Sequence, residues 1–128
     1  MIARMQAGTL HYLDFEYSED DQGHGTFDAM AAATPAQWPA LEAEVAGVLD
    51  WAHAQFGAPA AFDEGGEWDC ELQGVREVAT SLQVSHRPGA GLQLQPGATG
   101  EPRVTLSLTL TGTPAFCEAL RTAFALEC

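Results

Sequence analysis

The chain has 128 residues, of which 46% are hydrophobic and 18% are charged, a balance typical of a folded globular domain. Its 18 acidic residues outnumber its five basic residues, all of them arginine, and the formal net charge is −13. Nucleic acid and anionic membrane surfaces are disfavoured as partners, because recognising their phosphates requires an excess of basic side chains. We expect a single α+β domain over residues 1–128.

The negative charge is unevenly distributed along the sequence. After residue 77, three glutamates are balanced by three arginines, so the whole net charge belongs to residues 1–77. Two windows are especially acidic, one consisting of Asp14, Glu16, Glu19, Asp20, Asp21 and Asp28, and the other of Asp63, Glu64, Glu67, Asp69, Glu71 and Glu77. An acidic surface of this kind favours a basic protein as partner.

The first part of the chain predicts a hairpin followed by a helix. Residues 9–17 alternate between apolar and polar side chains, as a half-buried strand does, and the polar run 18–25 separates them from a second apolar segment at 26–33. We expect a hairpin with an acidic tip. The capping-box sequence from Thr34 to Gln37 predicts a helix whose regular part begins by Pro39 and which ends at Gly57.

The middle of the chain predicts two further strands and a loop. In residues 67–73, apolar side chains alternate with acidic ones, which indicates a strand that ends in a break around Gly74. Residues 78–84 form the next strand, and we expect it to pair with the preceding one as its antiparallel neighbour. Residues 86–102 contain three prolines and four glycines, a composition that predicts a long loop with at most a short edge strand at 92–94.

The last part predicts a strand and a closing helix. Residues 103–111 alternate between aliphatic residues and Thr or Ser, and Thr113-Pro114 supplies the cap and first turn of a helix. The predicted order is β-β-α-β-β-β-α, with an antiparallel sheet of about five strands and both helices on one face. Residues 9–57 and 78–126 share the order strand, strand, helix, which suggests a ββα pseudo-repeat.

No sequence motif indicates catalysis or metal binding. The three cysteines form no C-x-x-C pair, the four histidines lack a metal-ligand spacing, and no recognisable nucleophile motif is present. We therefore predict no cofactor, no metal and no catalytic residue, and consider an enzyme the less favoured class. The sequence contains no apolar segment of transmembrane length and no signal peptide, so we expect a cytoplasmic protein with reduced thiols.

Three functions stay open on the sequence alone. The first is a non-enzymatic, immunity-like or chaperone-like module that binds a basic protein; the second is a small-molecule or enzymatic pocket between the sheet and loop 86–102. The third is a structural domain that dimerises through the Thr/Ser-rich strand at 103–111. For the first, the predicted partner-binding residues are one tryptophan, expected to be partly exposed beside the apolar stripe of its helix, and eight acidic residues, namely Glu19, Asp20, Asp21, Trp51, Asp63, Glu64, Glu67, Asp69 and Glu71.

Overall fold

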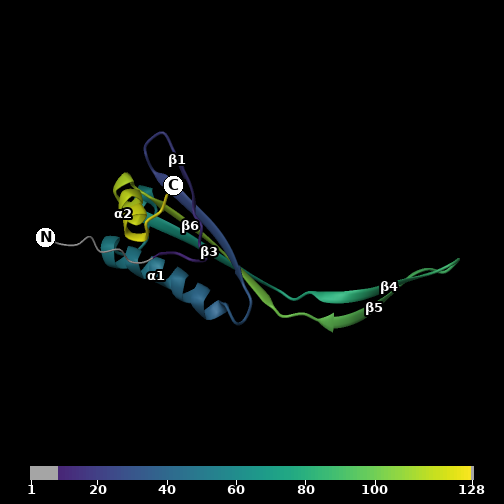
Figure 1. Cartoon of the computed structure of the whole chain (residues 1–128). Coiled ribbons are helices and arrows are strands. Elements are labelled where there is room, and N and C mark those ends of the chain that lie inside the picture. The colour runs from purple at the N-terminus through teal and green to yellow at the C-terminus, as the bar shows by residue number, and fades with distance from the viewer. Residues whose placement is uncertain (1–8, 128) are drawn as a thin grey trace.

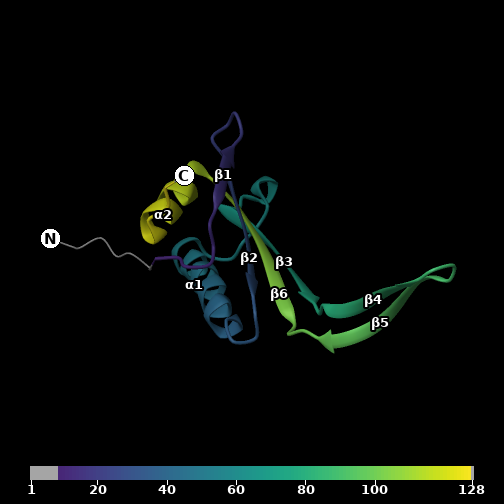
Figure 2. The ribbon, with the colours of Figure 1, turned by 45° about the vertical axis from the view of Figure 1, so that its right-hand side comes forward.

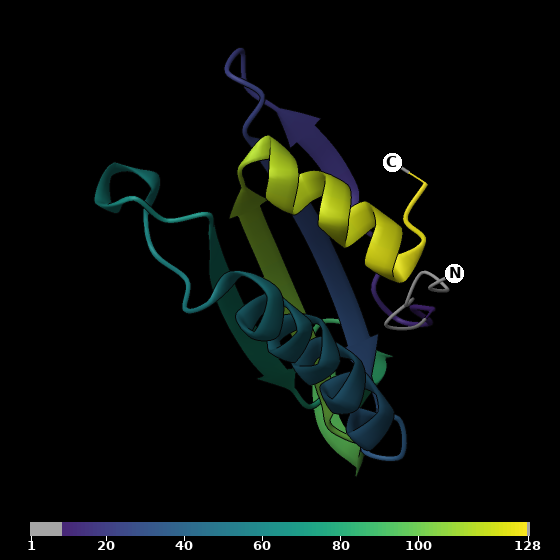
Figure 3. The same cartoon turned by 90° about the vertical axis from the view of Figure 1, so that its left-hand side faces the viewer.

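The structure is a computed structural model that describes residues 9–127. Its main sheet consists of four antiparallel strands in the order β1-β2-β6-β3, with bounds β1 Glu16–Glu19, β2 Gly25–Ala33, β6 Arg103–Gly112 and β3 Trp68–Glu77. The helices α1 (Trp38–Phe56) and α2 (Pro114–Phe124) lie on one face of this sheet, as Figure 3 shows. The α+β fold with both helices on one face of an antiparallel sheet is confirmed.

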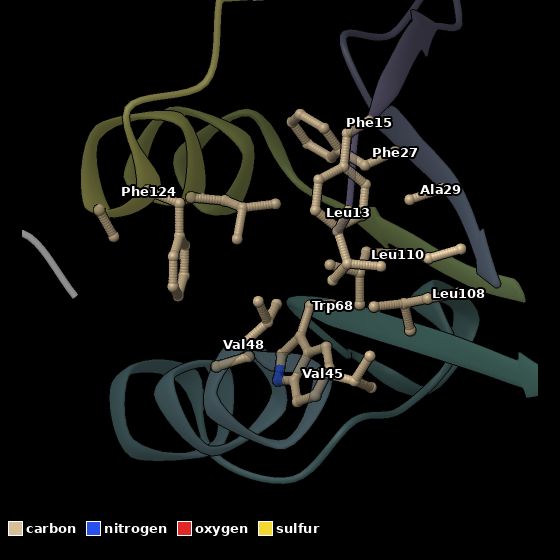
Figure 4. Close-up of a cluster of buried hydrophobic side chains, with 14 of the residues drawn as sticks. Leu13, Phe15, Phe27, Ala29, Val45, Val48, Trp68, Leu108, Leu110 and Phe124 are labelled. Atoms are coloured by element: carbon tan, nitrogen blue, oxygen red, sulfur yellow. The ribbon is translucent and has the colours of Figure 1, made fainter. Parts of the chain in front are cut away.

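The core lies between the main sheet and the two helices. Alternate residues of β2 and β6 face it, with Phe27 opposite Leu110 and Ala29 opposite Leu108, and α1 contributes Val45 and Val48 (Figure 4). Trp68, at the start of β3, is fully buried; its indole N–H donates to the carbonyl of Gly57, and its ring stacks on Phe116 of α2. The two helices and the sheet therefore share one apolar core.

The helix boundaries follow the predicted capping chemistry at α2 and only in part at α1, whose N-cap residue is Gln37 and has no side-chain cap hydrogen bond. The backbone N–H of Thr34 donates to the side-chain oxygen of Gln37, and regular α1 begins at Trp38 and ends before Gly57, whose φ is +79°. At α2, the Thr113 hydroxyl accepts the N–H of Phe116. Neither helix in residues 9–127 has the length and apolar character required to cross a bilayer.

The segment before β1 is held in a way that its sequence does not reveal. Leu13 and Phe15 are buried while Asp14 and Glu16 are exposed, as the alternation predicts, yet pairing with β2 begins only at Glu16. Upstream of that point the Glu44 carboxylate of α1 accepts three backbone N–H groups, those of His11 at 2.6 Å, Tyr12 at 2.8 Å and Leu13 at 2.7 Å. A side chain thus replaces the neighbouring strand as hydrogen-bond acceptor.

The middle of the chain differs from the prediction in three respects. The break expected near Gly74 is wrong, since β3 continues to Glu77. The pairing expected between residues 78–84 and the preceding strand is also wrong, because β3 pairs with β6, and β4 (Thr80–Arg87) pairs with β5 (Gly91–Thr99). The third error is the long loop at 86–102, most of which is strand β5. Within residues 9–127 the strands number six and divide into two sheets. Residues 78–126, expected to repeat the strand-strand-helix order of residues 9–57, contain three strands before α2.

Candidate functional site: a projecting β-arm

The hairpin of β4 and β5, which we call the β-arm (residues 80–99), extends into solvent from the C-terminal end of β3 and the N-terminal end of β6 (Figure 1). At its base, the N–H of Gly100 donates to the carbonyl of Ala79 at 2.7 Å. At its tip, residues 88–90 form a turn closed by a bond from the N–H of Ala90 to the carbonyl of Arg87. Gly89 and Gly91 both adopt positive φ, a conformation that glycine accepts at little cost and that the tight turn requires.

The two faces of the β-arm differ in chemistry. In its register Val84 is opposite Leu94 and Leu82 is opposite Pro96, so these four residues share one face. The other face carries Gln83 opposite Gln95 and Ser85 opposite Gln93. The apolar face is open to solvent, with exposed fractions of 52% for Leu82, 59% for Val84, 66% for Leu92 and 58% for Leu94.

The β-arm receives little support from the rest of the molecule. Within the described residues, β4 and β5 pair with each other and neither packs substantially on another element. Two side-chain contacts reinforce the pairing near the base, one between Thr80 and Thr99 at 3.4 Å and one from the Ser81 hydroxyl to the Ala98 carbonyl at 3.3 Å. A two-stranded hairpin with no further packing is marginally stable in water. As far as the structure describes the chain, the β-arm is therefore held mainly by its own cross-strand pairing.

A shallow apolar groove lies at the base of the β-arm, between the start of α1 and the ends of β3 and β6. Its volume is about 590 Å³, and apolar side chains form most of its wall, among them Trp38, Val75, Pro102, Val104 and Leu106. Gly74 lies in its floor, where an added Cβ would approach the Leu106 side chain to 3.2 Å. Gly74 thus leaves room for the Leu106 side chain opposite it, and its backbone stays within the β3–β6 pairing.

The predicted acidic residues lie toward the opposite end of the molecule (Figure 2). Glu19, Asp20 and Asp21 are at the tip of the β1–β2 hairpin, while Asp63 and Glu64 belong to the short 3-10 helix η1 (Phe62–Glu64). The two windows are brought together by His24, whose ring stacks on Phe62 with centroids 4.2 Å apart. Glu67 is adjacent, since its carboxylate accepts the Thr113 hydroxyl at 2.7 Å. We call the carboxylates of residues 19–21 and 63–67 the acidic end.

The remaining predicted site residues lie elsewhere. Asp69 and Glu71 are on β3, on the sheet face that the helices leave uncovered, in register with Thr111 and Thr109 of β6. Trp51 is half-buried between the helices, and its ring contacts those of Phe56, Phe116 and Phe124 at centroid distances of 5.6 to 6.1 Å. Packing of this kind makes Trp51 part of the core boundary, separate in space from the acidic end.

The hairpin tip is ordered by one carboxylate. Asp20 accepts the backbone N–H groups of Gln22 at 2.8 Å and His24 at 2.9 Å, and its second oxygen is 3.6 Å from Nδ1 of His24. The Gln22 bond first, and then the backbone and ring of His24, lower the pKa of Asp20 below its ordinary value. This carboxylate is therefore engaged in holding the turn.

The ionisable side chains of Tyr17, Cys117 and Arg121 form a cluster of the kind found in active sites, but the pKa values of Tyr17 and Cys117 are raised. Burial, supported by a 2.8 Å hydrogen bond from its hydroxyl to Glu19, raises the pKa of Tyr17 to about 12. Burial also raises the pKa of the Cys117 thiol, and Arg121 lies over the Tyr17 ring at 4.4 Å. Neither shift favours the deprotonated form that a nucleophile requires. Within residues 9–127, no three His, Cys, Asp or Glu side chains gather as metal ligands.

Comparison of the chain with protein-family models, curated protein sequences and solved structures finds no match. The functional argument therefore depends on the geometry of the chain itself. Sequence reasoning predicted a strand at 78–84 and at most a short strand at 92–94 but missed their pairing as a hairpin, although the sequence contains a usable signal. Leu82-Gln83-Val84-Ser85 and Leu92-Gln93-Leu94-Gln95 alternate with the same period and flank a Pro-Gly turn, a pattern that predicts a hairpin.

Proposed function

We propose that this chain is a non-enzymatic protein-interaction module that docks through the apolar face of the β-arm. The observation that carries the proposal is the exposure of Leu82, Val84, Leu92 and Leu94, each more than half accessible on one face of an unsupported hairpin. Contiguous exposed apolar surface with a polar reverse side is typical of an interaction site. Covering this face would remove it from water and stabilise the hairpin at the same time.

The chemistry of the β-arm favours a protein surface as its partner. Within residues 78–102 the formal charges are those of Arg87 and Glu101 alone, which cancel. A phosphate-rich partner would require clustered cations, and a surface of this length and low charge instead fits an apolar protein face. The free thiols of Cys70 and Cys117 support a reducing compartment, which we take to be the cytoplasm.

Photo-crosslinking in cells tests the proposal. p-Benzoylphenylalanine placed at position 84 probes the apolar face, and the same residue at position 85 probes the polar face of the same strand as a matched control. We expect position 84 to crosslink to protein much more strongly than position 85. Absence of crosslinks from position 84 in correctly folded protein, or equal weak yields from both positions, would contradict the proposal.

The convergence of two acidic windows supports a second candidate function, the binding of a basic protein at the acidic end in an immunity-like or chaperone-like manner. The His24–Phe62 stack brings together carboxylates from segments about forty residues apart, and neither residues 19–21 nor residues 63–67 contain an arginine. Opposite charge on a partner would accelerate the encounter and make the affinity depend on salt.

A triple neutralisation tests this second candidate. The variant Asp21→Asn, Asp63→Asn, Glu64→Gln should lose a basic partner that the wild-type chain retains at low salt and releases at high salt. The matched control Glu42→Gln, Asp50→Asn, Glu118→Gln removes the same charge from exposed positions on the helices and should retain it. Equal retention by both variants would assign the effect to net charge rather than to the acidic end.

A further inference from the structure

We propose that the partner of the β-arm is a second copy of this chain, in a two-fold dimer where two β-arms pack apolar face to apolar face in opposite directions. The tip of each β-arm would reach the apolar groove at the base of the other. This inference rests on the proposed function, because it names the occupant of the same surface. It differs from the dimer expected through the Thr/Ser-rich strand, β6, because its contact surfaces are the β-arm and the groove.

The distribution of charge restricts how two copies can meet. The chain has a net charge of −13, and contact through the acidic ends or through the uncovered sheet face with Asp28, Asp69 and Glu71 would place like charges together. Residues 78–102, which contain the β-arm, have no net formal charge, and the β-arm projects away from the acidic end (Figure 1). Oppositely directed β-arms keep the two acidic ends at the far ends of the dimer, where their repulsion is weakest.

The size of the surface explains why both the β-arm and the groove are required. Eight residues of β4 at roughly 3.3 Å each give a β-arm about 26 Å long, and two strands present a face roughly 10 Å wide. That face is smaller than the roughly 800 Å² per partner of a typical stable interface. The groove adds a second apolar contact, with the tip of the other β-arm. Because the dimer is two-fold symmetric, this contact between tip and groove occurs twice.

The same geometry identifies the residue nearest to the symmetry axis. The tip of the β-arm lies at residues 88–90, and β3 contributes residues 74–76 to the groove. When the tip of one copy meets the groove of the other, the midpoint between residues 75 and 89 is residue 82. Leu82, on the apolar face and 52% exposed in the single chain, would therefore face its own symmetry mate.

A charge-complementation experiment tests this prediction. In sedimentation velocity the wild-type chain should be a dimer, whereas Leu82→Asp and Leu82→Lys should each be monomeric, because each places two like charges together at the axis. We expect each variant to raise the dimer dissociation constant at least about tenfold. An equimolar mixture of the two should recover a dimer containing one copy of each. Gln83→Asp and Gln83→Lys, on the polar face, are the controls and should stay dimeric alone.

The outcomes separate this inference from the proposed function. A wild-type chain that stays monomeric at high concentration, while position 84 crosslinks to another protein in cells, overturns the second copy as partner and leaves the proposed function standing. Open-ended oligomers whose size increases with protein concentration would indicate head-to-tail contact and overturn the two-fold arrangement. Failure of the Asp and Lys variants to recover a mixed dimer also overturns it. The absence of any crosslink from position 84 would overturn both proposals.

Discussion

Val84 and Leu94 are directly opposite each other across the β-arm, and each exposes more than half of its side chain. Leu108 and Ala29 are also opposite each other, across β6 and β2, but there both side chains are buried beneath the helices. The same cross-strand pairing thus serves the core in one sheet and an open surface in the other. This contrast is the basis for assigning the β-arm to interaction rather than to folding.

Substitutions at these two kinds of pair should change stability by very different amounts. Val84→Asp should change the free energy of unfolding of the monomer by less than about 0.5 kcal/mol, since its environment is already aqueous. Leu108→Ala should cost about 2–5 kcal/mol, because it leaves a cavity under the helices. Urea denaturation at concentrations below the dimer dissociation constant measures both. A large loss for Val84→Asp would show that the β-arm supports the fold.

Glu44 should contribute strongly to stability despite its position on a helix surface. Its carboxylate accepts three backbone N–H groups from residues 11–13, and Glu44→Gln replaces one acceptor oxygen with an NH₂ group that cannot accept. We expect a loss of about 1–3 kcal/mol in urea denaturation. Glu42→Gln, exposed on the same helix, is the control and should be neutral. Equal stability of both variants would mean that the N-terminal segment is held by Leu13 and Phe15 alone.

The β1–β2 hairpin tip should respond to acid through Asp20. Its pKa is lower in the folded chain than in the unfolded one, so the stabilisation is present above the unfolded value and is lost as pH falls through the folded value. Asp20→Asn should therefore flatten the acid limb of the melting temperature measured from about pH 5 downward. Asp21→Asn is the control and should keep the wild-type limb. An unchanged limb in Asp20→Asn would show that the tip makes no net contribution.

The sequence predicted the structure correctly where an element depends on residues close in the chain and has one buried face. Leu41, Val45 and Val48 recur at helical spacing, and Thr113 caps α2, because each depends on neighbours close in the chain. The alternation of β6 was also readable, since one of its faces is buried beneath the helices. These features gave the α+β fold and the location of both helices.

The β-arm was missed because its prolines and glycines were interpreted as a loop. Pro96 is tolerated in β5 since the hairpin has two free edges, and Gly89 and Gly91 form the turn. The acidic residues of the candidate site were readable as two windows, but their convergence depends on the His24–Phe62 contact between distant segments. Nor could local sequence show that Trp51 packs on Phe124 of the last helix.

Amide hydrogen exchange of the β-arm is the most direct test of the claim that this element is a docking surface for a second copy of the chain. In the wild-type chain at high concentration we expect the amides of β4 and β5 to be protected. In Leu82→Asp they should exchange rapidly, while those of β2 and β6 stay protected in both proteins. Equal protection of the β-arm in both would show that the hairpin is stable unaided, and rapid exchange in both would show that no second copy covers it; either result contradicts the account.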